Sequence, residues 1–173
     1  ADTWSTERRW SLLAQSTLMA QAVGGDRFDP SRALVWTDGW DGYAPARQRL
    51  LQTVSQRRIP GCVVLGGDVH ATYVADLKVD PMAPGSPRVA TEFCGTSISS
   101  HGWEQKRTDA LLEMHPHLRY GRADERGYLS FRAEPGLLRV QVQSVLVPND
   151  PDSGIRTAAA FVVEAGRPGA QPG

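Results

Sequence analysis

The sequence predicts an α/β layered domain, of the α+β kind, that ends in a β meander. Strand and helix patterns alternate in the first half, and three strand patterns follow one another from Gly127 onward. The 173 residues suffice for one ordinary domain with a core, and a hydrophobic content of 40% is typical of a folded protein.

The first third of the chain combines ambiguous segments with one clear helix. Residues 10–22 are apolar but carry interspersed Ser, Thr and Gln, so they fit either a strand or a short helix. Residues 23–30 form a loop, and residues 32–37 are a short strand or a link into the next loop. A helix is predicted over 45–58, because a proline stands in its first turn and apolar side chains recur at helical spacing.

The remaining elements follow from apolar runs between turn residues. Residues 62–65 are a continuous apolar run that is typical of a buried strand. The other expected elements are a helix at 103–114 and strands at 72–78, 88–93, 127–133, 137–147 and 157–163. Loops are expected at 80–87 and 95–102. The domain is therefore expected to span residues 1–165, and the Gly/Pro/Ala-rich segment 166–173 is expected to be a flexible tail.

Composition argues against two classes of partner. Lys and Arg together equal Asp and Glu at 19 each, so the balanced charge gives no signal for nucleic-acid binding. No apolar run is long enough to span a membrane. No signal peptide is visible at Ala1, although a mature secreted chain would also lack one. Cys62 and Cys94 lie in apolar contexts typical of buried free thiols. The alternative is a disulfide between them, if their strands are adjacent.

The segment VVLGGDVH, which begins at Val63, carries the strongest functional signal. A buried strand ends in two glycines and is followed by Asp68 and His70. If the strand stays extended, these two side chains share one face, because side chains repeat every second residue. A carboxylate oxygen beside an imidazole nitrogen suits a mixed or binuclear metal site. The alternative is that Asp68 caps a turn and His70 is a satisfied core histidine.

A second segment, TDGWDGY from Thr37, adds two aspartates in a turn-rich loop. Asp38 is the first choice as a ligand, because it directly follows a strand-like segment. Asp41 is a further candidate, or it caps the turn or supports the ligands from behind. Trp40 and Tyr43 are expected to pack around the site. Together the two segments predict a metal-dependent hydrolase.

Other polar residues give weaker signals. The Ser/Thr/Gly loop after residue 94 could border a phosphate, but no His and Asp partners specific to a nucleophilic serine are visible. His115 and His117 flank a proline at a helix end, which we expect to be an exposed loop. We assign no catalytic residue beyond the metal ligands Asp68, His70, Asp38 and Asp41, and no substrate-binding residue.

Five blocks of the sequence resemble the alkaline phosphatase D (PhoD-like) family of phosphodiesterases and phosphomonoesterases, in the calcineurin-like metallophosphoesterase superfamily. The blocks are WSLLAQSTLMAQ from Trp10, TDGWDGYAPARQRLL from Thr37, VVLGGDVHATYVADLK from Val63, VATEFCGTSISS from Val89, and RGY at Arg126. They occur in the family's order and cover most of the chain up to about residue 163, and the ordered set is highly specific.

The resemblance implies two mixed sheets packed face to face and flanked by helices, with metals at the strand ends. This chain would be the second half of that metallophosphoesterase sandwich, with a carboxy-terminal β meander. The resemblance also implies iron and calcium, with other divalent metals possible, and a metal-bound hydroxide that attacks the phosphorus of a phosphate ester. Asp68 would then bind one metal and His70 the other. The family is secreted, so a periplasmic or extracellular location is expected.

The family's first metal-binding blocks have no counterpart in this sequence. We therefore expect a carboxy-terminal portion whose metal site is completed by the amino-terminal half of the same enzyme, acting as a companion chain. On its own the chain is expected to be inactive. Two alternatives remain, namely a phospholipase D of the same family and a non-catalytic β-rich module that binds a partner domain.

Overall fold

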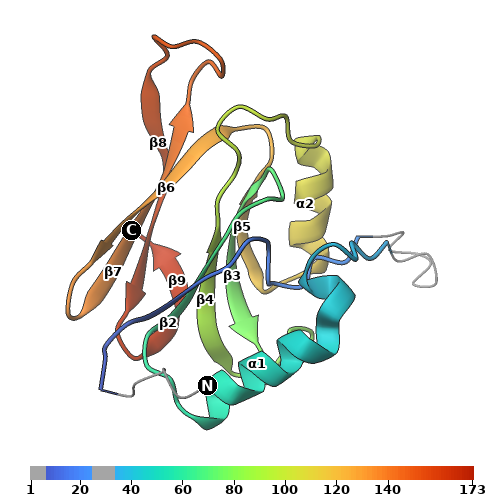
Figure 1. Ribbon diagram of the computed structural model, residues 1–173, viewed down its shortest axis with the longest axis vertical. Coiled ribbons are helices and arrows are strands. Elements are labelled where there is room, and N and C mark those ends of the chain that lie inside the picture. The colour runs from blue at the N-terminus through green and yellow to red at the C-terminus, as the bar shows by residue number, and fades with distance from the viewer. Residues whose placement is uncertain (1–6, 25–33) are drawn as a thin grey trace.

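The chain folds into three layers, with helices on one side of a mixed sheet and a second sheet on the other (Figure 1). The computed structural model describes residues 7–24 and 34–173. Within them the elements are β1 (Ser11–Ala14), the 3-10 helix η2 (Trp40–Tyr43), α1 (Ala44–Gln56), β2 (Cys62–Gly66), β3 (Thr72–Lys78), β4 (Arg88–Cys94), α2 (Gln105–Met114), β5 (Leu118–Arg122), β6 (Arg126–Ala133), β7 (Leu137–Val145), β8 (Ile155–Glu164) and β9 (Arg167–Pro172).

The first sheet has the strand order β1-β2-β4-β3-β5. Strands β1, β2 and β4 are parallel neighbours, whereas β3 runs antiparallel to both β4 and β5. The carboxyl ends of the three parallel strands therefore meet at one edge. Loops that leave the ends of adjacent parallel strands are where α/β sheets commonly carry their sites.

Two apolar cores hold the layers together. One lies between the first sheet and the helices, where Leu51 and Val54 of α1 and Leu111 of α2 pack on the sheet. The other lies between the two sheets and joins residues of β2, β3 and β4 to residues of the meander β6–β9; its members include Val63, Val74, Phe93, Leu138, Val140, Phe161 and Val163. Burial of such side chains contributes roughly 1.5–3 kcal/mol each, so both sheets are stabilised by the face that they share.

Most of the predicted elements are confirmed, including the α/β two-sheet fold, the helix after Pro45 and the buried strand before Gly66. The segment predicted as a strand or short helix over 10–22 is a strand only at its start. The sequence missed β5, between α2 and the meander. The loop expected at 23–30 lies largely outside the described residues. The described part of the segment 32–37 is a link rather than a strand, in which Leu34 makes an isolated antiparallel bridge to Gly24. None of the helices in the described ranges is long and apolar enough to cross a membrane.

The expectation of a flexible tail over 166–173 is wrong. Residues Arg167–Pro172 form β9, which pairs antiparallel with β8 and buries Ala170 against the inter-sheet core. The backbone N–H of Gly169 also donates to the buried Thr91 hydroxyl at 2.8 Å. A Gly/Pro/Ala-rich segment has low strand propensity, but an available neighbouring strand edge and a small buried side chain are enough to order it.

The two glycines after β2 differ in what surrounds them. A Cβ on Gly66 would collide with the backbone carbonyl of Thr17, which crosses directly over it, whereas the nearest atom to a Cβ on Gly67 is 3.7 Å away. We expect Gly66→Ala to lower the free energy of unfolding by about 1–3 kcal/mol. We expect Gly67→Ala to stay within about 0.5 kcal/mol of wild type. Urea unfolding followed by tryptophan fluorescence measures both, and equal losses would contradict the close backbone crossing.

Candidate metal centre

The turn after β2 presents Asp68 and His70 at the carboxyl edge of the first sheet. Strand β2 ends at Gly66, and both Asp68 (φ 67°) and His70 (φ 52°) have left-handed backbone conformations. Between them Val69 is buried in the core below the helices. The premise that an extended strand puts the two side chains on one face is therefore wrong. A buried valine anchors a tight turn, and the two polar residues flank it.

Left-handed backbone at two residues that are not glycine is uncommon in one short turn. Each such residue costs on the order of 1 kcal/mol, and strained residues concentrate at functional sites where the surrounding structure holds them. Here Gly95 N–H donates to the Gly66 carbonyl at 3.0 Å and the thiol of Cys94 lies 3.4 Å from the Gly67 carbonyl. Strand β4 thus holds the start of the turn in place.

The imidazole of His70 is oriented by a backbone acceptor. Its Nδ1 lies 2.9 Å from the carbonyl oxygen of His101, in the loop after β4. A carbonyl oxygen only accepts hydrogen bonds, so Nδ1 carries the proton and Nε2 keeps its free lone pair. Metal-binding histidines are held in this way, with the second ring nitrogen bonded to a carbonyl or carboxylate. No sequence pattern signals this acceptor, because it belongs to the main chain.

Asp38 lies in the turn before η2, with its carboxylate exposed to solvent. It borders a hollow of about 400 Å³ that Gln15, Thr17, Trp40 and Tyr43 also line. The indole N–H of Trp40 donates to the Gln15 side-chain oxygen at 3.0 Å, so Trp40 packs against the loop after β1. Tyr43, in contrast, is largely exposed.

The structure uses Asp41 differently from Asp38. One carboxylate oxygen accepts from Arg47 of α1 at 2.6 Å, and the other accepts from the backbone N–H of Ala22 at 2.9 Å. Both oxygens thus have partners within the chain, which matches the alternative of a supporting role. The ligand role of Asp41 stays a prediction.

A buried carboxylate that sequence reasoning missed completes this support. Glu92 of β4 is fully buried and accepts the backbone N–H groups of Met19 and Ala20 at 2.6 and 2.7 Å. Arg47 donates to the Met19 carbonyl at 3.1 Å. Burial raises the pKa of Glu92 to about 7, and its two backbone hydrogen bonds and Arg47 oppose that rise. A charged residue inside an apolar strand sequence is the signal that could have identified it.

The donor set fits part of a metal site. Asp68 supplies a hard carboxylate oxygen and His70 a free imidazole nitrogen, the types that calcium and iron respectively accept. Across residues 7–24 and 34–173, no group of three or more His, Cys, Asp or Glu is positioned to hold a metal ion. Asp38 is therefore not gathered with the Asp68–His70 pair into such a group.

The cysteines are confirmed as buried free thiols. They stand at opposite ends of adjacent strands, since Cys62 begins β2 whereas Cys94 ends β4. Burial raises the pKa of Cys62 to about 11 and raises that of Cys94 well above its ordinary value. Both thiols are therefore neutral near pH 7.

His115 and His117 are buried, so the expectation of an exposed loop is wrong. Their Nε2 atoms lie 2.9 and 2.8 Å from the carbonyl oxygens of Val23 and Gln21, and both Nδ1 atoms are buried with no hydrogen-bond partner among the described residues. The pair thus fastens the segment after Ala20 to the end of α2. A proline at a helix end predicts a loop, but it does not predict whether another segment of the chain covers that loop.

Burial lowers the pKa of His117 from 6.5 to about 4. The unfolded state therefore binds a proton first, and the free energy of unfolding falls as pH drops from 6.5 towards 4. We expect this loss to reach at most about 3 kcal/mol. His117→Gln, whose amide N–H can replace Nε2–H, should flatten the pH dependence. Urea unfolding at a series of pH values measures it, and an unchanged slope in His117→Gln would refute this assignment.

Comparison with known proteins decides the family. A profile of the PhoD-like phosphatases matches residues 2–142. This chain belongs to the PhoD-like phosphatase family. It is 32% identical over 168 residues to alkaline phosphatase D of Bacillus subtilis (strain 168). The aligned region covers 95% of this chain and 28% of that protein. A solved structure of PhoD superposes with a TM-score of 0.79 at 27% identity, over 93% of this chain and 31% of that chain.

These matches confirm the family that the sequence blocks indicated and the two-sheet fold that the resemblance implied. The PhoD-like chain described here spans less than a third of the length of the two relatives. The matched region 2–142 contains the Asp68–His70 turn, the Asp38 loop and the Glu92 network.

Proposed function

We propose that this PhoD-like protein hydrolyses phosphate esters, monoesters or diesters, at a metal site to which Asp68 and His70 contribute. The observation that carries the proposal is the His70 ring, whose Nδ1 is bonded to the His101 carbonyl while Nε2 makes no hydrogen bond to any of the described residues. When bound, iron and calcium, or other divalent metals, would polarise the phosphoryl oxygens and lower the pKa of a bound water.

The chain's own residues have separate tasks in this proposal. Asp68 contributes negative charge and a hard oxygen ligand, and His70 contributes a neutral nitrogen ligand of fixed tautomer. Asp38 is the third candidate, with its carboxylate free on the rim of the neighbouring hollow. Asp41 acts from behind, because it holds the backbone of Ala22 and the guanidinium of Arg47.

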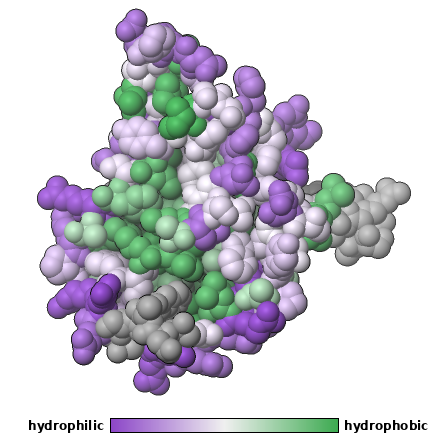
Figure 2. All heavy atoms as spheres, viewed as in Figure 1, coloured by the Kyte–Doolittle hydropathy of each residue, from purple (hydrophilic) through white to green (hydrophobic). Residues whose placement is uncertain are grey.

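We propose further that the remaining ligands come from the amino-terminal part of the family domain, present as a companion chain or as a covalently linked portion. Two observations support this. The described residues bring no third ligand to the pair. Within the described residues β1 is an edge strand, and together with exposed apolar side chains such as Leu12, Ile98 and Phe131 it offers a surface for another polypeptide. Figure 2 shows apolar side chains gathered over the strands on this face.

Hydrolysis of bis-p-nitrophenyl phosphate and of p-nitrophenyl phosphate tests the proposal. The 173-residue chain is assayed with iron and calcium, alone and together with the polypeptide that carries the amino-terminal part of the domain. We expect activity only in the combined sample, abolished by a chelator and restored by metal. Full activity of the chain alone would exclude an incomplete site, and a combined sample that is inactive and holds no metal would exclude the function.

The same assay separates the substrate classes. A preference for a phosphatidylcholine substrate over both nitrophenyl esters would assign the chain to the phospholipase D branch.

We also propose a periplasmic or extracellular location, because the family is secreted. Fractionation of the producing cells would test this location.

A further inference from the structure

Arg126, the first residue of β6, is a buried arginine that joins three segments around the Asp68–His70 turn. Its side chain is 5% exposed. Nη1 donates to the His70 carbonyl at 3.1 Å, to the Ser97 hydroxyl at 2.9 Å and to the Ser100 carbonyl at 2.8 Å, and Nη2 donates to the Ala123 carbonyl. These acceptors lie in the turn after β2, the loop after β4 and the connection between β5 and β6.

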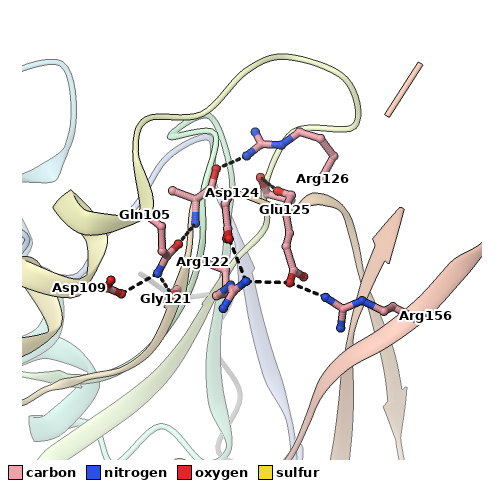
Figure 3. A network of polar contacts seen from close by, with 10 residues as sticks. Gln105, Asp109, Gly121, Arg122, Asp124, Glu125, Arg126 and Arg156 are labelled. Carbon is pink, nitrogen blue, oxygen red and sulfur yellow. Dashed lines mark hydrogen bonds and ion pairs between the residues drawn. The ribbon is translucent and has the colours of Figure 1, made fainter. Parts of the chain in front are cut away.

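Two of these acceptors, the His70 and Ala123 carbonyls, come close together beside Gly102. A Cβ placed on Gly102 would collide at once with the carbonyls of Ala123 and His70 and with Nη2 of Arg126. The Ala123 end is itself fixed, because its backbone N–H donates to the Gln105 side-chain oxygen at 2.8 Å. Figure 3 shows the guanidinium of Arg126 reaching towards this connection, above the Gln105 contacts.

Arg126 contacts the backbone of His70 directly and is linked to its ring through the loop after β4. It holds the His70 carbonyl directly, next to a left-handed backbone conformation that needs support. It also holds the Ser100 carbonyl, one residue before His101, whose own carbonyl accepts the Nδ1 proton of His70. One guanidinium therefore sets the orientation of the peptide that carries the ring and the position of the acceptor that fixes its tautomer.

The neighbouring arginines make contacts of another kind. Arg122 pairs with Asp124 at 2.9 Å and with Glu125 at 3.1 Å, and Arg156 pairs with Glu125 at 2.5 Å (Figure 3). These are partly exposed ion pairs that join β5 and β8. Arg126, in contrast, donates its hydrogen bonds to neutral oxygens, and it takes part in none of the ion pairs among the described residues. Burial of a guanidinium that forms no ion pair within the described residues is costly, and the nearby charge of Asp124 offsets only part of that cost, which indicates a task other than surface charge pairing.

We propose that Arg126 is a positioning residue that holds His70 in the Nδ1–H tautomer, with Nε2 directed as a metal ligand. The proposal rests on the proposed metal site for its functional consequence, but the tautomer of His70 is a property of the chain alone. In this role Arg126 acts through His70 and the loop after β4.

The test uses Arg126→Met and Arg126→Lys, with Arg122→Met as the matched control. The tautomer of His70 is read from ¹⁵N long-range NMR of the imidazole at about pH 8, where histidine is neutral. Metal affinity is measured by titrating iron and calcium into the chain combined with the amino-terminal part of the domain. We expect Nδ1–H alone in wild type and in Arg122→Met.

In Arg126→Met we expect mixed tautomers and a loss of about 10–100-fold in metal affinity, the usual effect of removing a partner behind a ligand. Arg126→Lys should be intermediate, because an ammonium keeps charge and donors but not the planar fork. An unaltered tautomer in Arg126→Met, or in Arg126→Lys where the methionine variant does not fold, would overturn the proposal. A changed tautomer in a protein that binds no metal would support the positioning role and count against the metal site instead.

Discussion

Asp68→Asn and His70→Asn are each expected to lower metal affinity and phosphodiester hydrolysis by about 100-fold or more. Removal of a residue that only hydrogen-bonds to a metal ligand lowers metal affinity or activity by roughly 10–100-fold. Loss of the ligand atom itself should lower them at least as much. Asparagine is the appropriate replacement because it tolerates the left-handed backbone that both positions adopt. At position 70 its amide N–H can also still donate to the His101 carbonyl.

The matched control is His101→Ala. The only part of His101 that serves His70 is its backbone carbonyl, and alanine keeps that group. We expect this variant to retain wild-type metal affinity and hydrolysis. Titration with iron and calcium, hydrolysis of bis-p-nitrophenyl phosphate and urea unfolding are measured on all three variants in the combined enzyme. If Asp68→Asn and His70→Asn fold, bind metal and hydrolyse the diester as well as wild type does, the ligand assignment fails.

Arg47→Met should be the most destabilising of the substitutions considered for the fold. Arg47 is buried, forms an ion pair with Asp41 at 2.6 Å and faces the fully buried Glu92. Methionine would leave two carboxylates without their shared cation. Removal of one member of a buried charge network costs about 3–5 kcal/mol, because the remaining charge stays out of water. Arg49→Met on the exposed side of α1 is the control, and we expect it to change stability by less than about 0.5 kcal/mol.

The loss in Arg47→Met should depend on pH. The folded pKa of Glu92, about 7, lies above its ordinary value of 4.5, so protonated Glu92 favours the folded state. Its contribution to stability is present below pH 4.5 and is lost as pH rises through 7. Without Arg47 the ionised form is still less tolerated, so Arg47→Met should lose more stability at pH 8 than at pH 5. Denaturant unfolding at both values measures this, and a small, pH-independent loss would show that the network contributes little.

The elements that the sequence predicted are those whose cause is local. Residues 62–65 and 72–78 carry apolar runs long enough to specify strands, and residues 45–58 repeat at the helical period after a proline. The short strands β5 and β9 were missed, because their arginine, glycine and proline residues have little strand propensity. They exist because β3 and β8 offer them free edges.

The site divides in the same way. Asp68, His70 and Asp38 could be selected from the sequence, because metal chemistry restricts residue types and because these residues follow a buried strand or a strand-like segment. Glu92, Arg47 and the buried histidines His115 and His117 could not be assigned their roles, since the backbone groups that they bind lie between 28 and 96 residues away. Their contacts exist only after α1, α2 and the loop after β1 pack on the first sheet.

The family could be read from the resemblance of five ordered sequence blocks, and the order of the main elements and the chemical types of the candidate ligands from periodicity and residue type, because all of these are properties of the chain before it folds. Only the tertiary structure decided that β2 ends in a left-handed turn around a buried Val69, that the His101 carbonyl selects the tautomer of His70, and that Asp41 faces inward to Arg47. These features depend on main-chain groups and on charges brought together from distant segments, and no local pattern encodes where such groups meet.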